Sequence, residues 1–207
     1  MTAPDGGLRF DDAYLEETLL PDGTPVLFRL IRPEDRELLR RGFEALSPTS
    51  RYRRFLMAKS ALSDGELRHL TEIDGWDHLA IGAGRRVGDR IEEPLGVARY
   101  VRLAGGDVVA EAAIAVVDDW QGRGLGRMLF ERLAAAAWER GVRRFRVEML
   151  AENTQMHALT KVLGPRDSMR VADGLLTAEF ALPESAPDAP LESSAYRALA
   201  IAAGARG

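Results

Sequence analysis

The sequence predicts an α/β (α+β) fold, with a mixed central β-sheet flanked by helices on both faces. Apolar patterns follow one another in the order strand, helices, a meander of strands, helix, strand, helix and hairpin, and this order places helices on both faces of one sheet. The segment at 125–140 carries its apolar residues at helical spacing on one face, which is typical of a helix that packs on a sheet. Between this segment and a strand pattern at 108–117 lie three glycines at alternate positions, Gly122, Gly124 and Gly126.

The first half of the chain divides into strands and helices by its periodicity and its turn residues. Residues 21–24 are a turn signal ahead of an alternating strand at 26–31. Pro33, followed by two acids, opens a helix, and the capping-box spacing of Ser63 and Glu66 starts another. The other expected segments are a strand or arm at 15–20, a helical piece at about 48–57, a short strand at 79–83, a polar hairpin connection at 85–93, and strands at 95–103 and 108–117.

The second half continues with a helix, a strand, a helix and a hairpin. Gly141 ends the long helix at a C′ position, and alternating apolar residues predict a strand at 143–150. A helix is expected at 153–163, and Asp173 followed by Gly174 is typical of a two-residue hairpin turn. The expected units are an N-terminal arm or strand at 1–23, a domain at 24–182, and a proline-rich linker with a C-terminal tail helix at 183–207.

Composition excludes several classes of function. The chain has 207 residues, 46% hydrophobic and 29% charged, with a net charge of −4, so nothing in the overall charge favours nucleic acid or an anionic membrane. The absence of cysteine excludes disulfides, a thiol nucleophile and thiolate metal sites. The histidines His69, His78 and His157 have no ligand spacing, so no metal is expected. Without a signal-peptide pattern or an apolar run of roughly 20 residues, a cytoplasmic protein is expected.

The stretch at 118–127 joins the strand pattern to the long helix and predicts a diphosphate site. Amide groups in the first turn of a helix have no partners within the helix, and the helix dipole favours an anion there. Glycines let the backbone approach a phosphate closely, while Arg123 and Arg127 add cations. The third glycine comes too early for the dinucleotide fingerprint Gly-x-Gly-x-x-Gly, and a Walker loop would need Gly-Lys-Ser/Thr.

The same stretch resembles the GCN5-related N-acetyltransferase (GNAT) family. Its signature, Gln/Arg-x-x-Gly-x-Gly/Ala at a helix N-terminus after a central strand, matches Gln121-Gly122-Arg123-Gly124-Leu125-Gly126. The second strand at 143–150 and Ala151-Glu152-Asn153 add to the match, as does Ile31-Arg32-Pro33-Glu34-Asp35. Residues 43–48, with Arg51-Tyr52, Ala110-Glu111 and the loop itself, are most similar to the acetyltransferase domain of bacterial protein-lysine acetyltransferases. The resemblance covers about residues 24–182 and implies the GNAT fold.

The resemblance implies acetyl-coenzyme A (acetyl-CoA) as donor and gives roles to named residues. The pyrophosphate would lie on the N–H groups of Gln121 to Gly126, Leu125 included, with Arg123 and Arg127 nearby. The pantetheine arm would pair with the strand that ends at Val116 and Val117, and Asn153 would contact the coenzyme while also capping a helix.

In the protein-lysine acetyltransferases that the chain resembles, a glutamate ten residues before the loop glutamine is taken as general base, and Glu111 matches that position. It precedes Val117 by six residues, or about 20 Å of strand, comparable with the reach of pantetheine. A lysine ammonium must lose its proton before it attacks, and a partly buried glutamate can take it. Many relatives place a tyrosine seven residues after the asparagine as general acid, whereas Thr160 stands here.

Three functions stay open at this stage. The first is an N-acetyltransferase acting on a primary amine, with a protein lysine among the candidates. The second is a non-catalytic acyl-CoA-binding regulatory module, and the third is a small-molecule amine acetyltransferase. Arg51, Arg53 and Arg54 either line an acceptor cleft or form a solvated helix face. A homodimer formed through the last hairpin and the tail is a further expectation.

Overall fold

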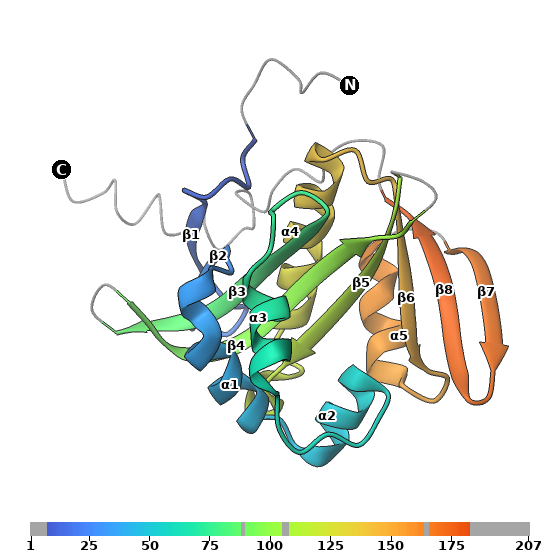
Figure 1. Ribbon diagram of the computed structural model, residues 1–207, viewed down its shortest axis with the longest axis horizontal. Coiled ribbons are helices and arrows are strands. Elements are labelled where there is room, and N and C mark those ends of the chain that lie inside the picture. Colours follow the sequence, from blue (N-terminus) through green and yellow to red (C-terminus); the bar gives the residue numbers. More distant parts are fainter. Residues whose placement is uncertain (1–7, 88–89, 105–107, 164–165, 183–207) are drawn as a thin grey trace.

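The computed structural model describes residues 8–87, 90–104, 108–163 and 166–182, and shows one eight-stranded sheet with helices on both faces (Figure 1). The strand order is β1-β2-β3-β4-β5-β6-β8-β7. Among the strands that the structure describes, β5 and β6 alone pair in parallel. The strands are β1 (Leu15–Leu19), β2 (Pro25–Leu30), β3 (His78–Val87), β4 (Arg90–Arg102), β5 (Val109–Val116), β6 (Arg144–Leu150), β7 (Arg166–Ala172) and β8 (Leu175–Ala181).

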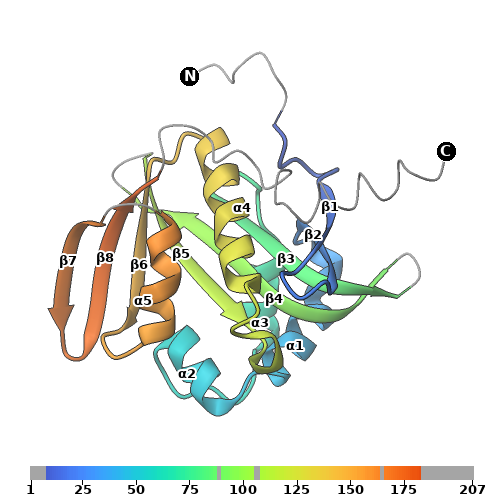
Figure 2. The ribbon, with the colours of Figure 1, turned by 180° about the vertical axis from the view of Figure 1, so that it is seen from behind.

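The helices form two layers. In Figure 1 the first three helices lie in front of the sheet, and Figure 2 shows the last two on the opposite face. The α-helices are α1 (Arg36–Glu44), α2 (Pro48–Phe55), α3 (Asp64–Thr71), α4 (Leu125–Glu139) and α5 (Thr154–Thr160), and the 3-10 helices are η1 (Pro33–Asp35), η2 (Asp118–Trp120) and η3 (Lys161–Leu163). The predicted mixed sheet with helices on both faces is therefore confirmed.

Helix α4 lies along the middle of the sheet and supplies much of the core. Its apolar side carries Leu129, Phe130 and Leu133, each fully buried. These side chains pack with Ala110 and Ala112 of β5, which are also buried. Since side chains alternate along a strand, Glu111 and Ala113 point to the opposite face, where α1, α2 and α3 lie. The two faces of β5 thus have different neighbours, and this difference positions the site.

Several local predictions are confirmed by the backbone. Ser63 and Glu66 form the expected capping box of α3. Gly141 follows α4 with φ of 82°, as a C′ glycine should. Asp173 and Gly174 both have positive φ, 51° and 76°, which is the backbone of the turn predicted between β7 and β8.

The segment at 85–93 joins two antiparallel strands, as the predicted hairpin connection should, but more of it is strand than the sequence indicated. Strands β3 and β4 extend through it as a long hairpin, with register shifts at Ala83/Gly84 and Arg85/Arg86. Arg85 and Glu93 face each other across the two strands and form an ion pair at 3.1 Å. The polar side chains gave no strand pattern in the sequence, but on an exposed hairpin opposite charges pair across the strands and are compatible with a sheet. The linker and tail at 183–207 and the Gly164-Pro165 helix end lie outside the described residues.

Within the described part of the sheet, the parallel pair of β5 and β6 has the fewest paired residues. Strands β5 and β6 are paired only from Val109↔Arg144 to Glu111↔Arg146. Beyond Glu111, β5 continues beside β4 as far as Val116, whereas β6 continues beside β8. The two strands diverge in Figure 1, with α5 next to the widening gap. The C-terminal half of β5 therefore has a free edge in the centre of the molecule.

Candidate active site

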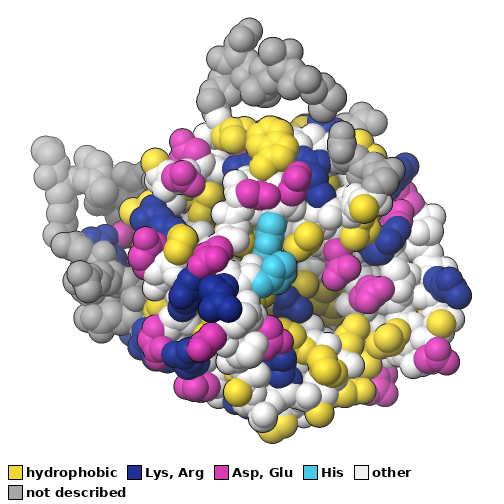
Figure 3. Space-filling view, viewed as in Figure 1, with side chains coloured by type: hydrophobic (Ala, Val, Ile, Leu, Met, Phe, Trp, Pro, Cys, Tyr) yellow, Lys and Arg dark blue, Asp and Glu magenta, His cyan; other side chains and the backbone are white. Residues whose placement is uncertain are grey.

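A cleft of about 720 Å³ opens where β5 and β6 separate. One wall is the free half of β5, the opposite wall is α5 with the end of β6, and the glycine loop and α2 close the ends. Hydrophobic side chains gather in the hollow on the face seen in Figure 3. The lining residues are Leu46, Ser50, Arg53, Arg54, Ala112, Ala113, Ile114, Ala115, Val116, Gln121, Gly122, Gly124, Gly126, Arg127, Glu148, Met149, Asn153, Gln155, Met156, Ala158, Leu159 and Lys161.

The register of β4 and β5 shows which backbone groups face this cleft. The N–H of Val117 donates to the carbonyl of Leu95 at 2.9 Å. In an antiparallel pair the bonded residues alternate, and the register between these strands has no irregularity. The amides of Ala113 and Ala115 therefore point to β4, while those of Ile114 and Val116 point away from it, into the cleft. An extended ligand can pair with them as an additional strand would.

The N-terminus of α4 adjoins the same cleft without a side-chain cap. Its N-cap residue, Gly124, has φ of 87° and no side chain that could cap the first turn. Gly122 also has positive φ, and a Cβ placed there would meet nothing within 4 Å. The amides of Leu125, Gly126 and Arg127 have no partner within the helix, and this opening is where an anion binds best. The loop therefore leaves backbone donors for an anion, and its role as a diphosphate site stays a prediction.

Most of the predicted coenzyme-binding residues come together at this cleft. Those that line it are Val116, Gln121, Gly122, Gly124, Gly126, Arg127 and Asn153. Leu125 is fully buried, so only its backbone faces the loop. The N–H of Val117 is already bonded to Leu95.

Arg123 does not line the cleft. Its guanidinium forms an ion pair with Asp22 at 2.6 Å and stacks on Trp120 at 4.2 Å. These contacts fix the loop against the turn between β1 and β2. The predicted role of Arg123 as a side-chain cation for phosphate stays a prediction.

A polar network, which the sequence analysis missed in part, holds the loop to α2. Gln121 Nε2 donates to the carbonyl of Val116 at 2.9 Å and to Ser50 Oγ at 3.2 Å. Ser50 Oγ and Ser47 Oγ both donate to Asp118 Oδ1, at 2.8 and 2.7 Å, and the Ser47 N–H donates to Oδ2 at 2.9 Å. Burial alone would raise the pKa of Asp118, but these hydrogen bonds hold it below its usual value. The Ser47-Pro48 helix start was visible in the sequence, but its partner, more than 70 residues away, was not.

Asn153 and Thr160 sit at the two ends of α5. Asn153 Oδ1 accepts from the Met156 N–H at 3.1 Å, which confirms it as the N-cap, and Asn153 also lines the cleft. Thr160 is 1% exposed, and its hydroxyl donates to the carbonyl of His157 at 3.1 Å. That hydroxyl is bonded within the helix, which agrees with a structural role for Thr160, and the absence of an acid role stays a prediction.

Glu111 lies at the point where the β5–β6 pairing ends. Its side chain is exposed, shares a face with Ala113 and Ala115, and lies just beyond the residues that line the cleft. Arg54 reaches toward this face from α2. Burial lowers the pKa of Arg54, and the negative charge of Glu111 acts in the opposite direction. The two charges are thus close enough to interact without forming an ion pair.

Comparison with known proteins agrees with this geometry. The acetyltransferase (GNAT) family matches residues 37–164. An acetyltransferase of Pseudomonas aeruginosa is 34% identical over 158 residues, which cover 73% of this chain and 84% of that protein. The crystal structure of the GNAT domain of S. lividans PAT superposes with a TM-score of 0.72 at 30% identity, covering 81% of this chain and 97% of that one.

A protein of Salmonella typhimurium, solved with acetyl-CoA as its cofactor, shares the fold with a TM-score of 0.56 at 19% identity, covering 79% of this chain and 98% of that one. The chain belongs to the GNAT family and is an acyltransferase of the N-acetyltransferase type. The resemblance to bacterial protein acetyltransferases is also confirmed. The helices that the structure describes are all too short or too polar to cross a membrane. Within the same residues, no group of three His, Cys, Asp or Glu side chains is arranged to hold a metal ion.

Proposed function

We propose that this protein transfers acetyl from acetyl-CoA to a primary amine by direct attack, with Glu111 as general base. The observation that carries the proposal is the joining, in one cleft, of a free strand edge and an uncapped helix N-terminus. A diphosphate fits the second feature and an extended amide-bearing arm fits the first. Coenzyme A carries both groups, a diphosphate followed by the pantetheine arm.

The chain's own residues would hold the donor through the backbone. The amides of Gly122 to Gly126 receive the diphosphate, and those of Ile114 and Val116 pair with the pantetheine amides. Asn153, on the opposite wall, adds a side-chain contact. The bound acetyl-CoA supplies a thioester carbonyl for attack. An amide of β5 that points into the cleft is placed to stabilise the oxyanion that forms on this carbonyl.

Glu111 would take the proton from the attacking amine. An ammonium has a pKa near 10.4, so a base is needed at neutral pH. Glu111 lies about 17 Å from Val116 along the strand, at 3.3 Å per residue, and the intervening residues on its face, Ala113 and Ala115, are small. A thiol has a pKa near 8.5, so its thiolate leaves without a dedicated acid. This fits the structural role of Thr160.

Two acceptor classes remain candidates. Similarity to the PAT domain favours a protein lysine. A small-molecule amine is the alternative. The non-catalytic module is the third reading, and a base positioned at the end of the cleft argues against it.

The test is turnover of Glu111→Gln, with Glu37→Gln on the exposed side of α1 as the matched control. We expect kcat to fall about 100-fold or more, while the Kd for acetyl-CoA changes less than twofold, because Glu111 lies outside the coenzyme cleft. Thiol release by Glu111→Gln at the wild-type rate with a good acceptor would exclude the base role. Coenzyme A binding without thiol release across a panel of amines and proteins would favour the regulatory module.

A further inference from the structure

We propose that Arg54 of α2 and Arg99 of β4 form a carboxylate-binding subsite at the acyl-transfer end of the cleft. The subsite would receive a carboxylate carried by the substrates, either on the amine acceptor close to its amino group or at the end of the transferred acyl group. This inference rests on the proposed acyl transfer and narrows its substrate class. It follows from the positions, partners and charges of the two arginines.

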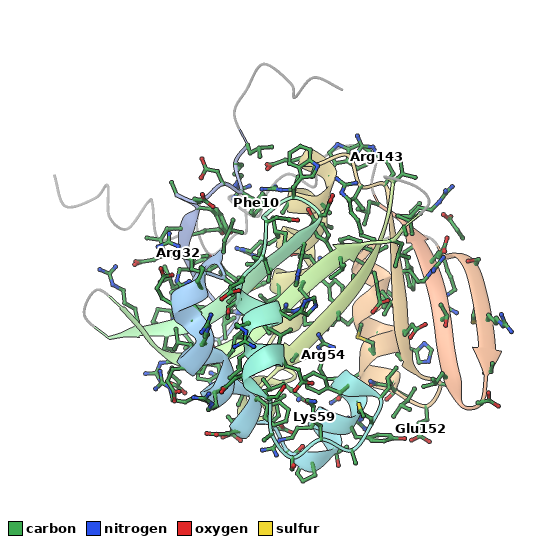
Figure 4. All side chains as sticks on the ribbon, in the orientation of Figure 1. Phe10, Arg32, Arg54, Lys59, Arg143 and Glu152 are labelled. Carbon is green, nitrogen blue, oxygen red and sulfur yellow. The ribbon has the colours of Figure 1, made fainter. Side chains whose placement is uncertain are left out.

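The two guanidinium groups share the Glu111 face of the sheet. In the antiparallel register Arg99 is opposite Ala113, and Val101 is opposite Glu111. Arg99 is therefore next to the part of β5 that leads from the cleft to the proposed base. Arg54 reaches the same place from the other side, lying between α2 and β5 in Figure 4.

Arg54 also marks the boundary between two spaces. It lines the coenzyme cleft, and together with Arg99 it lines an apolar cavity of about 80 Å³ between the first three helices and the sheet. Leu46 and Ala115 line both spaces as well. The arginines thus stand where an acyl group or an acceptor would extend beyond the coenzyme sulfur.

Arg99 has only uncharged partners in the part of the chain that the structure describes. It is 5% exposed, and it donates to the carbonyl of Leu70 at 3.3 Å and to His78 Nε2 at 3.0 Å. Burial, Arg99 itself and His69 together lower the pKa of His78 to about 4. His78 is therefore neutral at pH 7 and accepts the hydrogen bond without adding charge. Burial, followed by the charge of Arg54, lowers the pKa of Arg99 to about 9, so Arg99 stays a cation.

Arg54 is likewise without a carboxylate partner among the described residues. Its guanidinium lies 5.0 Å from the centre of the Phe55 ring. The nearby negative charge that acts on it is that of Glu111, which forms no ion pair with it. Asp35, which also lines the apolar cavity, is fully engaged, since it accepts two bonds from Arg29 and one from the Arg32 N–H.

Other buried arginines of the fold are compensated. Arg132 pairs with Glu16, and Arg29 forms a two-bond pair with Asp35. Arg140 donates to three backbone carbonyls and lies 3.6 Å from Glu139. Burying a charge without a partner is costly, and such groups concentrate at functional sites. The uncompensated pair lies at the end of the cleft.

The charge balance selects the ligand. Two cations and one anion, Glu111, give this end of the cleft an excess of positive charge. A dication such as a polyamine would be repelled there. A carboxylate matches the planar fork of a guanidinium and can accept two hydrogen bonds from it. An amino acid, which carries a carboxylate beside its amine, or an acyl chain that ends in a carboxylate supplies this group.

The test compares carboxylates with uncharged counterparts in two arms of equilibrium binding. In the acceptor arm, the proteinogenic amino acids and their carboxamides are titrated by calorimetry into protein saturated with coenzyme A. In the donor arm, succinyl-CoA is compared with butyryl-CoA. Both arms use the wild type, Arg54→Met, Arg54→Lys and the control Arg170→Met, which removes an exposed arginine from the edge strand β7. Circular dichroism checks the fold of each variant.

We expect the carboxylate to bind roughly 10- to 100-fold tighter than its counterpart in one arm, the range for hydrogen bonds to a charged group. The arm that shows the preference identifies its source. Arg54→Met should reduce the ratio to about 2 or less, Arg54→Lys should retain part of it, and Arg170→Met should leave it unchanged. Equal binding in both arms, no binding of any acceptor or donor carboxylate, or a ratio retained in Arg54→Met would overturn the proposal.

The same proteins separate this proposal from the transferase proposal. Thiol release from acetyl-CoA is measured with the amino acids and with their carboxamides. If no amine supports it while the binding ratio depends on Arg54, acyl transfer fails and the carboxylate subsite stands. If transfer occurs but the ratio is about 1 in both arms, the subsite fails and the transferase proposal stands.

Discussion

Replacing Asp118 with alanine should reveal how strongly the glycine loop depends on α2. The Asp118 carboxylate accepts three hydrogen bonds, two from Ser47 and one from Ser50. Ser47 is also the N-cap of α2, through a bond from the Ser50 N–H at 3.2 Å. Removing the carboxylate therefore weakens the start of α2 and its attachment to the loop together. The side chain of the adjacent Asp119 is exposed and makes no hydrogen bond or ion pair within the described ranges, so Asp119→Ala is the matched control.

The magnitude follows from the number and type of bonds. Hydrogen bonds to a charged group contribute about 1.5–3 kcal/mol each, but these three share one carboxylate that is only half buried, so their effects do not add. We expect Asp118→Ala to lower the free energy of unfolding by about 2–3 kcal/mol. In a domain of this size that corresponds to a decrease in Tm of roughly 4–12 °C. Asp119→Ala should stay within about 0.5 kcal/mol of the wild type.

The assay is urea unfolding followed by circular dichroism, repeated from pH 7 to pH 3. The pKa of Asp118 is lower in the folded protein than its usual value. Its stabilising contribution is therefore fully present above the unfolded pKa, near 3.9, and is lost as pH falls through the folded pKa. The difference between wild type and Asp118→Ala should be constant down to about pH 4 and then shrink. Equal stability of the two alanine variants at pH 7, or a difference that persists unchanged at pH 3, would refute the reasoning.

Three further predictions follow from single contacts. Gly124→Ala should weaken acetyl-CoA binding at least tenfold, because a Cβ at φ of 87° would lie 3.1 Å from Pro21 and disturb the loop. Gly23→Ala, at φ of 85° in open space, should cost about 1–2 kcal/mol of stability and leave the Kd for acetyl-CoA unchanged. Equal Kd values for the two variants would refute the role of Gly124 in shaping the loop. The pKa of His78 is about 4 in the folded protein, so between pH 6.5 and pH 4 the unfolded state binds one more proton and the wild type loses stability as the pH falls. His78→Gln should reduce this loss. An unchanged dependence of the free energy of unfolding on pH would contradict the prediction. Thr160→Val should keep kcat and its pH profile within about twofold, since the hydroxyl is bonded to His157 inside α5; a kcat loss above tenfold would restore Thr160 as a candidate acid.

Most of the fold was predictable from the sequence because its elements depend on local patterns of residues. The capping box at Ser63, the turn at Asp173 and the C′ glycine at Gly141 were predicted because each depends on a few neighbouring residues. The arrangement of the glycine loop was predictable for the same reason, since strand, glycines and helix follow each other in the chain. The hairpin connection at 85–93 was predicted, but the length of its strands was not, because their stability comes from pairing across strands.

The parts of the site that depend on distant contacts were not predictable. The engagement of Arg123 by Asp22 joins residues 101 positions apart, and no periodicity signals it. The bonds of Asp118 to α2 are of the same kind. The uncompensated charges of Arg54 and Arg99 become visible only when all their neighbours are known, because an arginine in a sequence gives no sign of what it lacks. Sequence placed Arg54 at an acceptor cleft or on a solvated face, and the structure places it in the cleft wall.

The proposed coenzyme A site between β5 and β6 is tested most directly by a crystal structure of this protein with coenzyme A. We expect the diphosphate oxygens to lie within hydrogen-bond distance of the backbone amides between Gly122 and Arg127. We also expect the pantetheine amides to pair with Ile114 and Val116, so that the sulfur points toward Glu111. Coenzyme A bound away from the β5–β6 cleft, or no binding at millimolar concentration, would contradict the proposed site.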